Sequence, residues 1–412
     1  MELRPILSAL WRHKITTGLI VLEIALSCAI ICNLLFLIDA RMQRMQRPSG
    51  VVENEVLLVK VGGTSASQDN DAAATTQADL VALRTIPGVK AAATASQATF
   101  GSAYMSRGVY LDKDAARTIL YASSYAGSDE LFDVLGLSLA AGRKFNPDEF
   151  IELNALETPD STQGVPAVII TRHMAGTLFP GRSAVGQSIY AWGDQPIRIV
   201  GVVERLVRAN DAGDAHYEDS MLFPVRIPYI KGGRFLIRVD DPARRAEVLK
   251  AAIKILHDGN SRRVVSERDS APIEQMRDRY YLKDRAMAWL LVAACLGLVV
   301  ITALGIVGLS SFWVQQRTKQ IGVRRALGAT RGQILRYFQT ENFLLVTVGI
   351  ALGMLLAYAI NQWLMAKYAL PRLPLSYLPI GAVTLWLLGQ IAVFGPARRA
   401  AAVPPAVATR SV

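Results

Sequence analysis

Cysteine and histidine are scarce in this sequence of 412 residues, which contains three cysteines and four histidines. Cys28, Cys32 and Cys295 all fall inside long apolar runs, so the polar part of the chain is expected to fold without disulfides. The three could ligate a metal together, although the packing of small apolar side chains is the favoured interpretation. The histidines show no metal-ligand spacing and are His13, His173, His216 and His257. We therefore expect no metal site.

Motifs for nucleotide binding and for hydrolytic catalysis are also missing. No Gly-x-x-x-x-Gly-Lys-Ser/Thr loop occurs, and residues 328–332 lack both the lysine and the preceding strand that such a loop requires. Neither Gly-x-Ser-x-Gly nor His-Glu-x-x-His is present, and the carboxylates form no convincing catalytic set. We therefore expect a protein that is not an enzyme and binds no cofactor itself.

Long apolar runs, by contrast, are abundant, and 51% of the residues are hydrophobic. Four runs have about the length of 20 residues that crosses a bilayer. The expected fold class is a multi-pass α-helical membrane protein with four transmembrane helices and a large α+β extracytoplasmic domain inserted between the first and second helices. The expected segments are an interfacial helix at 1–17, transmembrane helices at 18–38, 286–314, 343–366 and 378–395, the inserted domain with stalk helices at 39–285, connecting loops at 315–342 and 367–377, and a tail at 396–412.

Basic residues outnumber acidic ones, with 45 Lys and Arg against 34 Asp and Glu, and much of the excess flanks the apolar runs. The stretch 317–336 carries six basic residues and no acidic one, so the positive-inside rule predicts that this loop and both termini are cytoplasmic. Arg41, Arg44 and Arg47 argue the other way, but long translocated domains largely escape the rule. Orientation and anionic headgroups explain the net charge of +11, so no nucleic-acid partner is expected.

The inserted domain shows a mixed pattern of strands and helices. Alternating β-branched residues predict strands at 51–61 and 197–203, and a helix is expected at 242–256. Residues 64–77 are rich in Ser, Thr, Ala and Asp and are expected to form a mobile surface insertion. The flanks at 36–47 and 273–285 are polar and helical, and we expect them to form rigid stalks.

The basic loop between the second and third runs has its own helix signals. Gly328 fits a helix C-cap, and Thr330 with Gln333 fits a capping box that opens the next helix. These signals predict a helix, a tight turn and a second helix. In the first helix apolar side chains alternate with Arg324 and Arg325, which predicts a surface on which a cytoplasmic partner docks.

This loop, which ends in Ala-Leu-Gly-Ala-Thr at 326–330 and is followed by Glu341 before the next run, resembles the FtsX-like permease domain of MacB-type ABC transporters. The order of elements in the inserted domain and the tail at 396–404 resemble the same family, so the resemblance covers nearly the whole chain. The resemblance implies that an ATPase docks on the loop, with Glu341 orienting it. The docking residues would be Ile321, Gly322, Arg324, Arg325, Leu327 and Gly328.

The resemblance further implies an inner-membrane permease subunit with both termini in the cytoplasm. ATP hydrolysis on a cytoplasmic ABC ATPase subunit, which binds the ATP and Mg, would drive a conformational change of the periplasmic domain and export a periplasmic or membrane-derived substrate. Because the sequence begins almost at the first run, the ATPase is expected on a separate chain. Further implied partners are a second permease, as homodimer or heterodimer with a sister chain, a periplasmic adaptor and an outer-membrane channel.

Two other functions stay open. The first is that of an FtsX-like signalling subunit, which controls a cell-wall hydrolase or senses an extracytoplasmic ligand. The large size of the inserted domain favours transport over this alternative. The second is a receptor that acts alone, which the short cytoplasmic segments argue against because they cannot hold an output domain.

Two features inside the apolar runs are candidate contact sites. Glu23 lies about one turn from the cytoplasmic boundary, so it pairs across a subunit interface, reaches the surface or stays protonated. Gly349, Gly353 and Ala357 place small residues at every fourth position of one helix face, which lets another helix approach closely. Packing within the monomer is slightly favoured over packing between subunits.

Overall fold

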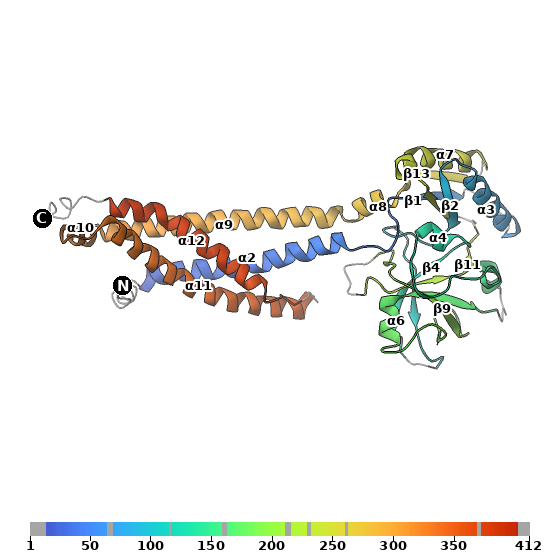
Figure 1. Cartoon of the computed structure of the whole chain (residues 1–412), viewed down its shortest axis with the longest axis horizontal. Coiled ribbons are helices and arrows are strands. Elements are labelled where there is room, and N and C mark those ends of the chain that lie inside the picture. Colours follow the sequence, from blue (N-terminus) through green and yellow to red (C-terminus); the bar gives the residue numbers. More distant parts are fainter. Residues whose placement is uncertain are drawn as a thin grey trace. The chain divides into compact units, whose positions relative to one another are not determined.

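The structure is a computed structural model that describes residues 14–63, 69–114, 117–158, 163–210, 216–228, 232–259, 263–368 and 372–402. The chain divides into two compact units (Figure 1). The first, the helical unit, comprises Met1–Met45 and Lys283–Val412, and the second, the inserted domain, comprises Gln46–Leu282. Residues 1–13 of the interfacial helix expected at 1–17, and residues 403–412 of the tail expected at 396–412, lie outside the described residues, whereas residues 14–17 belong to the first described helix, Lys14–Gln46.

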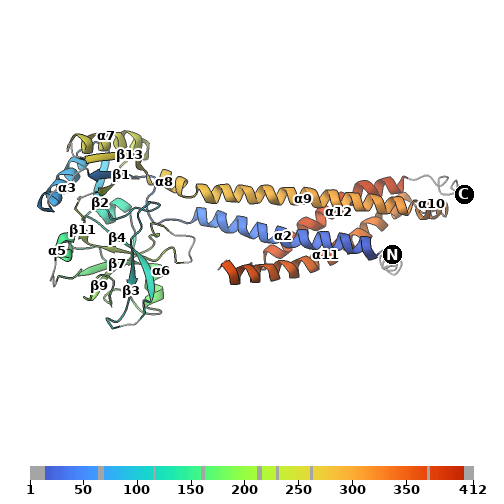
Figure 2. The same cartoon turned by 180° about the vertical axis from the view of Figure 1, so that it is seen from behind.

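Among the described residues, four helices are long and apolar enough to cross a membrane (Figure 2). Each one contains one of the apolar runs of the sequence. They are α2 (Lys14–Gln46), α9 (Leu282–Gln316), α11 (Arg331–Tyr368) and α12 (Tyr377–Ala401). Together with the α+β domain inserted between α2 and α9, these helices confirm the expected fold class.

Small residues let α2 lie close against α11 within the helical unit. A Cβ added to Gly349 would lie 2.7 Å from the Ile24 side chain, and one added to Gly353 would lie 2.5 Å from Cβ of Cys28. One turn further on, Nδ2 of Asn33 donates to the Ala357 carbonyl at 3.2 Å. The stripe of small residues therefore packs within one chain, and the buried thiol of Cys28 fills space in this contact.

The inserted domain contains a four-stranded antiparallel sheet in the order β13-β1-β12-β2. Its strands are β1 (Val56–Gly63), β2 (Val89–Thr94), β12 (Gly232–Val239) and β13 (Arg263–Pro272). The helices α3 (Asp69–Arg84) and α7 (Arg245–Asp258) pack on one face. Leu80 of α3 and Val248 of α7 are buried there against Val59 and Ile237, so this face has its own apolar core.

A second sheet has the order β3-β4-β10-β7-β9-β5, with β8 paired to β9. Its strands are β3 (Ser106–Val109), β4 (Leu120–Ala126), β5 (Leu139–Gly142), β7 (Ala167–Thr171), β8 (Ser188–Ile189), β9 (Ile197–Val203) and β10 (Ser220–Phe223). The short strands β6 (Ile151–Glu152) and β11 (Val225–Arg226) pair separately. Short helices complete the domain: α4 (Leu131–Leu135), η1 (Pro147–Glu149), α5 (Leu153–Glu157), α6 (Arg172–Leu178), η2 (Pro242–Arg244) and α8 (Ile273–Tyr280).

The two sheets share a buried apolar core. Leu58 and Leu236 of the first sheet meet Ile169 and Leu222 of the second in this core. Ile273, the first residue of α8, is fully buried in it as well. Burial of an isoleucine contributes about 2 kcal/mol, so α8 is held firmly to both sheets.

Two expectations differ from the structure. Residues 64–68 lie outside the described residues, but 69–77 form the first half of α3, where Thr76 is buried and donates to the Ala72 carbonyl at 2.7 Å. The expected insertion is therefore wrong for 69–77, because Ala and Thr at helical spacing bury a face that composition alone does not reveal. The second flank is not one helix, since α8 and α9 meet at Tyr281, which leaves helical geometry with φ −90° and ψ 8°.

Candidate docking site at the connection between α9 and α11

The connection between α9 and α11 contains a short helix, α10 (Thr318–Ala326), which ends in a Schellman motif. The Ala329 N–H donates to the Arg324 carbonyl at 3.0 Å, and the Gly328 N–H donates to the Arg325 carbonyl at 3.1 Å. Gly328 has φ +97°, which glycine adopts without the steric penalty of a Cβ. The predicted C-cap is confirmed.

The turn then opens α11 through a capping box. The Gln333 N–H donates to Oγ1 of Thr330 at 3.3 Å, and the Thr330 N–H donates to Oε1 of Gln333 at 2.9 Å. The connection is therefore a helix, a defined turn and a helix, as predicted. Its two caps hold the segment in one geometry.

The six predicted docking residues divide into inward and outward groups. Ile321 and Gly322 are buried, and Ile321 packs with Ile334 and Phe338 of α11. Arg324 and Gly328 are exposed, and Leu327 is 83% exposed. We name Val323, Arg324 and Leu327 the α10 surface. Val323, which is 53% exposed, was not among the predicted docking residues, although its apolar side chain beside Arg324 is the same signal that singled out Leu327.

Arg325 contacts another helix of the same unit. Its Nη1 donates to the Ala401 carbonyl at 2.6 Å, at the last residue of α12. A cation at a helix C-terminus satisfies an unpaired carbonyl and interacts favourably with the helix dipole. Arg325 therefore links α10 to α12, a contact that no local pattern predicts.

A buried ion pair links the start of the connection to α11. Nη1 of Arg317 lies 3.0 and 3.1 Å from the two carboxylate oxygens of Glu341. The two side chains are only 9% and 2% exposed. The pair joins the residue between α9 and α10 to the first third of α11, a geometry consistent with the predicted role of Glu341 in orienting the loop.

Polar contacts also join α2 to α9. The carboxylate of Glu23 lies directly against Gly305 of α9, where an added Cβ would force the Glu23 side chain to move. Ser27 Oγ and Thr302 Oγ1 share a hydrogen bond of 2.7 Å, and Nη1 of Arg44 lies 3.3 Å from Oδ1 of Asp284. Glu23 thus faces a helix of its own chain, and its pairing across a subunit interface stays a prediction.

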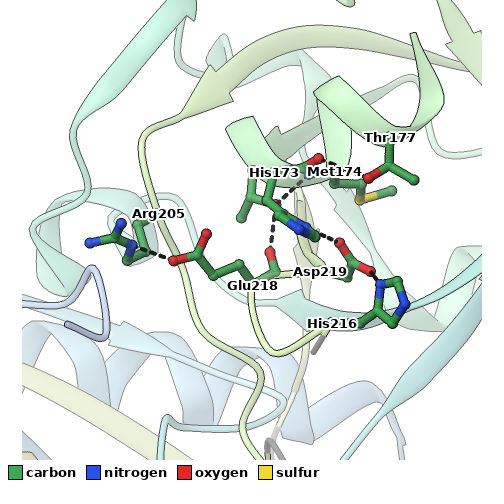
Figure 3. Close-up of polar contacts among 8 residues, drawn as sticks. His173, Met174, Thr177, Arg205, His216, Glu218 and Asp219 are labelled. Atoms are coloured by element: carbon green, nitrogen blue, oxygen red, sulfur yellow. Dashed lines mark hydrogen bonds and ion pairs between the residues drawn. The ribbon is translucent and has the colours of Figure 1, made fainter. Parts of the chain in front are cut away.

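In the inserted domain, the structure brings together two histidines that appeared unrelated in sequence (Figure 3). Nδ1 of His173 lies 2.8 Å from Oδ1 of Asp219, and Nδ1 of His216 lies 3.0 Å from Oδ2 of the same carboxylate. The Asp219 side chain is completely buried. Within the described ranges no group of three His, Cys, Asp or Glu residues could hold a metal.

Neighbouring bonds show what this cluster does. Oγ1 of Thr171 donates to the Glu218 carbonyl at 2.6 Å and accepts the Met174 N–H at 3.4 Å as the N-cap of α6. The cluster therefore fastens α6 to the segment that enters β10. The hydrogen bonds arise from the fold, so the wide spacing of His173 and His216 in the sequence concealed them.

Four membrane-spanning helices, an α+β domain inserted after the first of them and a capped helical hairpin define a class of membrane permease. Two family models match the chain: the MacB-like periplasmic core domain over residues 17–255 and the FtsX-like permease C-terminal domain over residues 292–405. The chain therefore belongs to the family of MacB-like and FtsX-like ABC transporter permeases, and it is a multi-pass inner-membrane protein.

Individual relatives are distant. The macrolide export ATP-binding/permease protein MacB of Acinetobacter baylyi is 25% identical over 68% of this chain, and the chain spans about two fifths of that relative, 41%. An uncharacterized ABC transporter permease of Bacillus subtilis, YknZ, is 23% identical over 99% of this chain and 98% of its own length. Among solved structures, the periplasmic region of MacB from Actinobacillus actinomycetemcomitans is 14% identical, with a TM-score of 0.34, over 58% of this chain and 99% of its own.

Proposed function

We propose that this chain is the permease subunit of an ATP-driven ABC export system and that an ABC ATPase subunit docks on the α10 surface from the cytoplasm. The single observation that carries the proposal is the exposed α10 surface on a doubly capped hairpin. Leu327 exposes 83% of its surface beside the cation of Arg324. An apolar side chain this exposed, next to a basic one, suits a partner with an apolar pocket and an acidic rim.

The contacts of the hairpin explain how docking would move the rest of the helical unit. Ile321 and the pair of Arg317 with Glu341 couple α10 to α11, and Arg325 couples it to α12. The helix α11 packs on α2 through Gly349 and Gly353. A displacement of α10 thus reaches α2, and from there α9 through the bond between Ser27 and Thr302.

The chain continues from α2 and α9 directly into the two ends of the inserted domain, so movement of these helices would reshape that domain. In this proposal the partner ATPase binds ATP and Mg, the permease works as a homodimer or with a sister chain, and an adaptor and outer-membrane channel receive the substrate. The substrate enters from the periplasm or the membrane, so no path between the four helices is needed.

The test measures ATPase stimulation in proteoliposomes that contain the permease and its ABC ATPase, identified by co-purification from native membranes and by its phosphate loop. Arg324→Glu combined with Leu327→Asp should reduce stimulation at least about tenfold, because both changes place acidic groups in the interface. Arg399→Glu, which makes the same change at an exposed position of α12 as Arg324→Glu makes in α10, is the control and should retain stimulation. Unchanged stimulation in the double variant would refute the docking assignment.

A further inference from the structure

A cavity of about 340 Å³ lies in the inserted domain where β1, β12, the loop at 98–102 and α8 meet. We name it the junction cavity. Its volume is in the range of small-molecule sites. The side chains that matter to the argument are Lys60, Arg234, Arg279, Phe100, Met276 and Tyr280.

The cavity wall has an excess of positive charge. Lys60 and Arg234 are directly opposite each other in the pairing of β1 with β12, an arrangement that destabilises a sheet when nothing neutralises it. Lys60 has a partner, because its Nζ lies 2.8 Å from Oδ2 of Asp269. Three basic side chains and one carboxylate line the cavity, so Arg234 and Arg279 are left without a counter-charge in its wall.

The contacts of the two arginines are with backbone carbonyls. Nη1 of Arg234 donates to the Ser96 carbonyl at 2.9 Å, and Nη1 of Arg279 donates to the Arg268 carbonyl at 3.2 Å. No carboxylate of the described ranges lies within ion-pair distance of either. Burial lowers the pKa of Arg234, as expected for a guanidinium that is partly removed from water.

Aromatic side chains also line the cavity, and one of them has a strained backbone. Phe100 is the sole non-glycine residue with positive φ, +60°, among those the structure describes. Such a conformation costs about 1 kcal/mol or more and persists only where the surroundings impose it. Its ring lies 5.6 Å from the ring of Tyr280 and 5.9 Å from that of Tyr281.

We propose that the junction cavity binds an amphipathic anion, whose carboxylate or phosphate is held by Arg234 and Arg279 and whose apolar part lies along Phe100, Met276 and Tyr280. Guanidinium groups match the geometry of both acid groups. Three of these side chains, Met276, Arg279 and Tyr280, belong to α8, so the ligand would contact the helix that continues through Tyr281 into α9.

A larger cavity, of about 620 Å³, lies beside α3 and is a weaker candidate. Its two arginines already have partners in the wall. Nε of Arg84 lies 3.2 Å from Glu130, and Nε of Arg226 lies 2.7 Å from Asp129. Its wall also contains Glu152, so three carboxylates face two arginines and no excess of positive charge is present to hold an anion.

The test uses the full chain in phosphatidylcholine nanodiscs and a diazirine-bearing decanoate as the photoreactive probe. Peptide mapping should place label within 98–102 and 276–280. Octyl phosphate should compete with the probe, whereas octyl glucoside, which has the same tail without charge, should not. Competition by octyl glucoside to the same extent, or label confined to the membrane-spanning helices, would overturn the proposal.

Two further arms identify the source of the anion. Loss of labelling in nanodiscs that contain phosphatidylglycerol, without added competitor, assigns the site to a membrane lipid, and retained labelling assigns it to an anion from solution. Both results support an amphipathic anion. Competition by inorganic phosphate equal to that of octyl phosphate would overturn it, because the apolar wall would then contribute nothing.

Variants separate binding from folding. Arg234→Gln should reduce labelling of the two peptides at least about tenfold, since it removes a charged hydrogen-bond donor. Arg234→Lys, which keeps the charge, should recover part of the labelling. Arg244→Gln, at a partly exposed arginine outside the cavity, is the control and should label normally. Ser102→Trp, at an exposed rim position, should block labelling without changing any charge. Normal labelling in both Arg234→Gln and Ser102→Trp would refute the site.

The inference does not depend on the proposed ATPase coupling, because binding is measured without nucleotide or partner. Failure of the ATPase test would leave the labelling result intact. Failure of the labelling test would leave the docking assignment intact.

Discussion

Removing one partner of the buried pair between Arg317 and Glu341 should destabilise the helical unit strongly. In Glu341→Leu the guanidinium of Arg317, 9% exposed, loses both carboxylate contacts at 3.0 and 3.1 Å and stays buried. Two charges about 4 Å apart attract by about 4 kcal/mol at an effective dielectric constant of 20. Loss of one member of a buried pair costs about 3–5 kcal/mol, because the remaining charge is uncompensated.

The assay is thermal unfolding in detergent, followed by a thiol-reactive fluorophore. Cys28 and Cys32 are buried, so their reaction reports opening of the helical unit. The double variant Arg317→Met with Glu341→Leu should regain most of the lost stability, since no buried charge remains. A double variant as unstable as the sum of the two single variants would refute the reasoning. Arg336→Met, at an exposed position of α11 in the same helical unit, is the control and should change stability by at most about 1 kcal/mol.

Two further predictions concern packing and pH. Gly353→Leu should destabilise the helical unit by about 1–3 kcal/mol in the same assay, because its Cβ would lie 2.5 Å from Cβ of Cys28. Gly308 has open space around it, so Gly308→Leu should be nearly neutral. Equal effects of the two variants would contradict the packing of α11 on α2. The hydrogen bond from Arg143 lowers the pKa of Glu149 below its ordinary value of 4.5. The pair therefore stabilises the fold fully above about pH 4.5, and this contribution is lost as the pH falls through the lowered pKa. The stability difference between the natural chain and Glu149→Gln, up to about 1 kcal/mol, should shrink below that pH, and a constant difference would contradict the assignment.

The parts of the fold that depend on local properties were predictable. Four apolar runs of bilayer length became α2, α9, α11 and α12, because a membrane-spanning backbone must satisfy its own hydrogen bonds within the helix. The turn at Gly328 and the cap at Thr330 were predictable for the same reason, since each depends on residues a few positions apart. The mobile insertion predicted for 69–77 was wrong, because composition describes the polarity of a segment. It does not show that Ala72 and Thr76 are buried on one face of a helix.

The candidate sites depended more on distant contacts. Sequence placed six docking residues on one basic hairpin, but it did not show that Ile321 and Gly322 face α11 or that Arg325 donates to Ala401. The convergence of His173 and His216 on Asp219 was equally hidden.

By itself, the sequence determined which segments enter the membrane and where the helices of the hairpin stop, because hydropathy and capping act over a few neighbouring residues. Only the tertiary structure decided which side chains of the hairpin are exposed and which charges are paired. It also decided that Lys60, Arg234 and Arg279 surround one cavity. These outcomes depend on residues far apart in the chain, and no local pattern encodes the packing that brings them together.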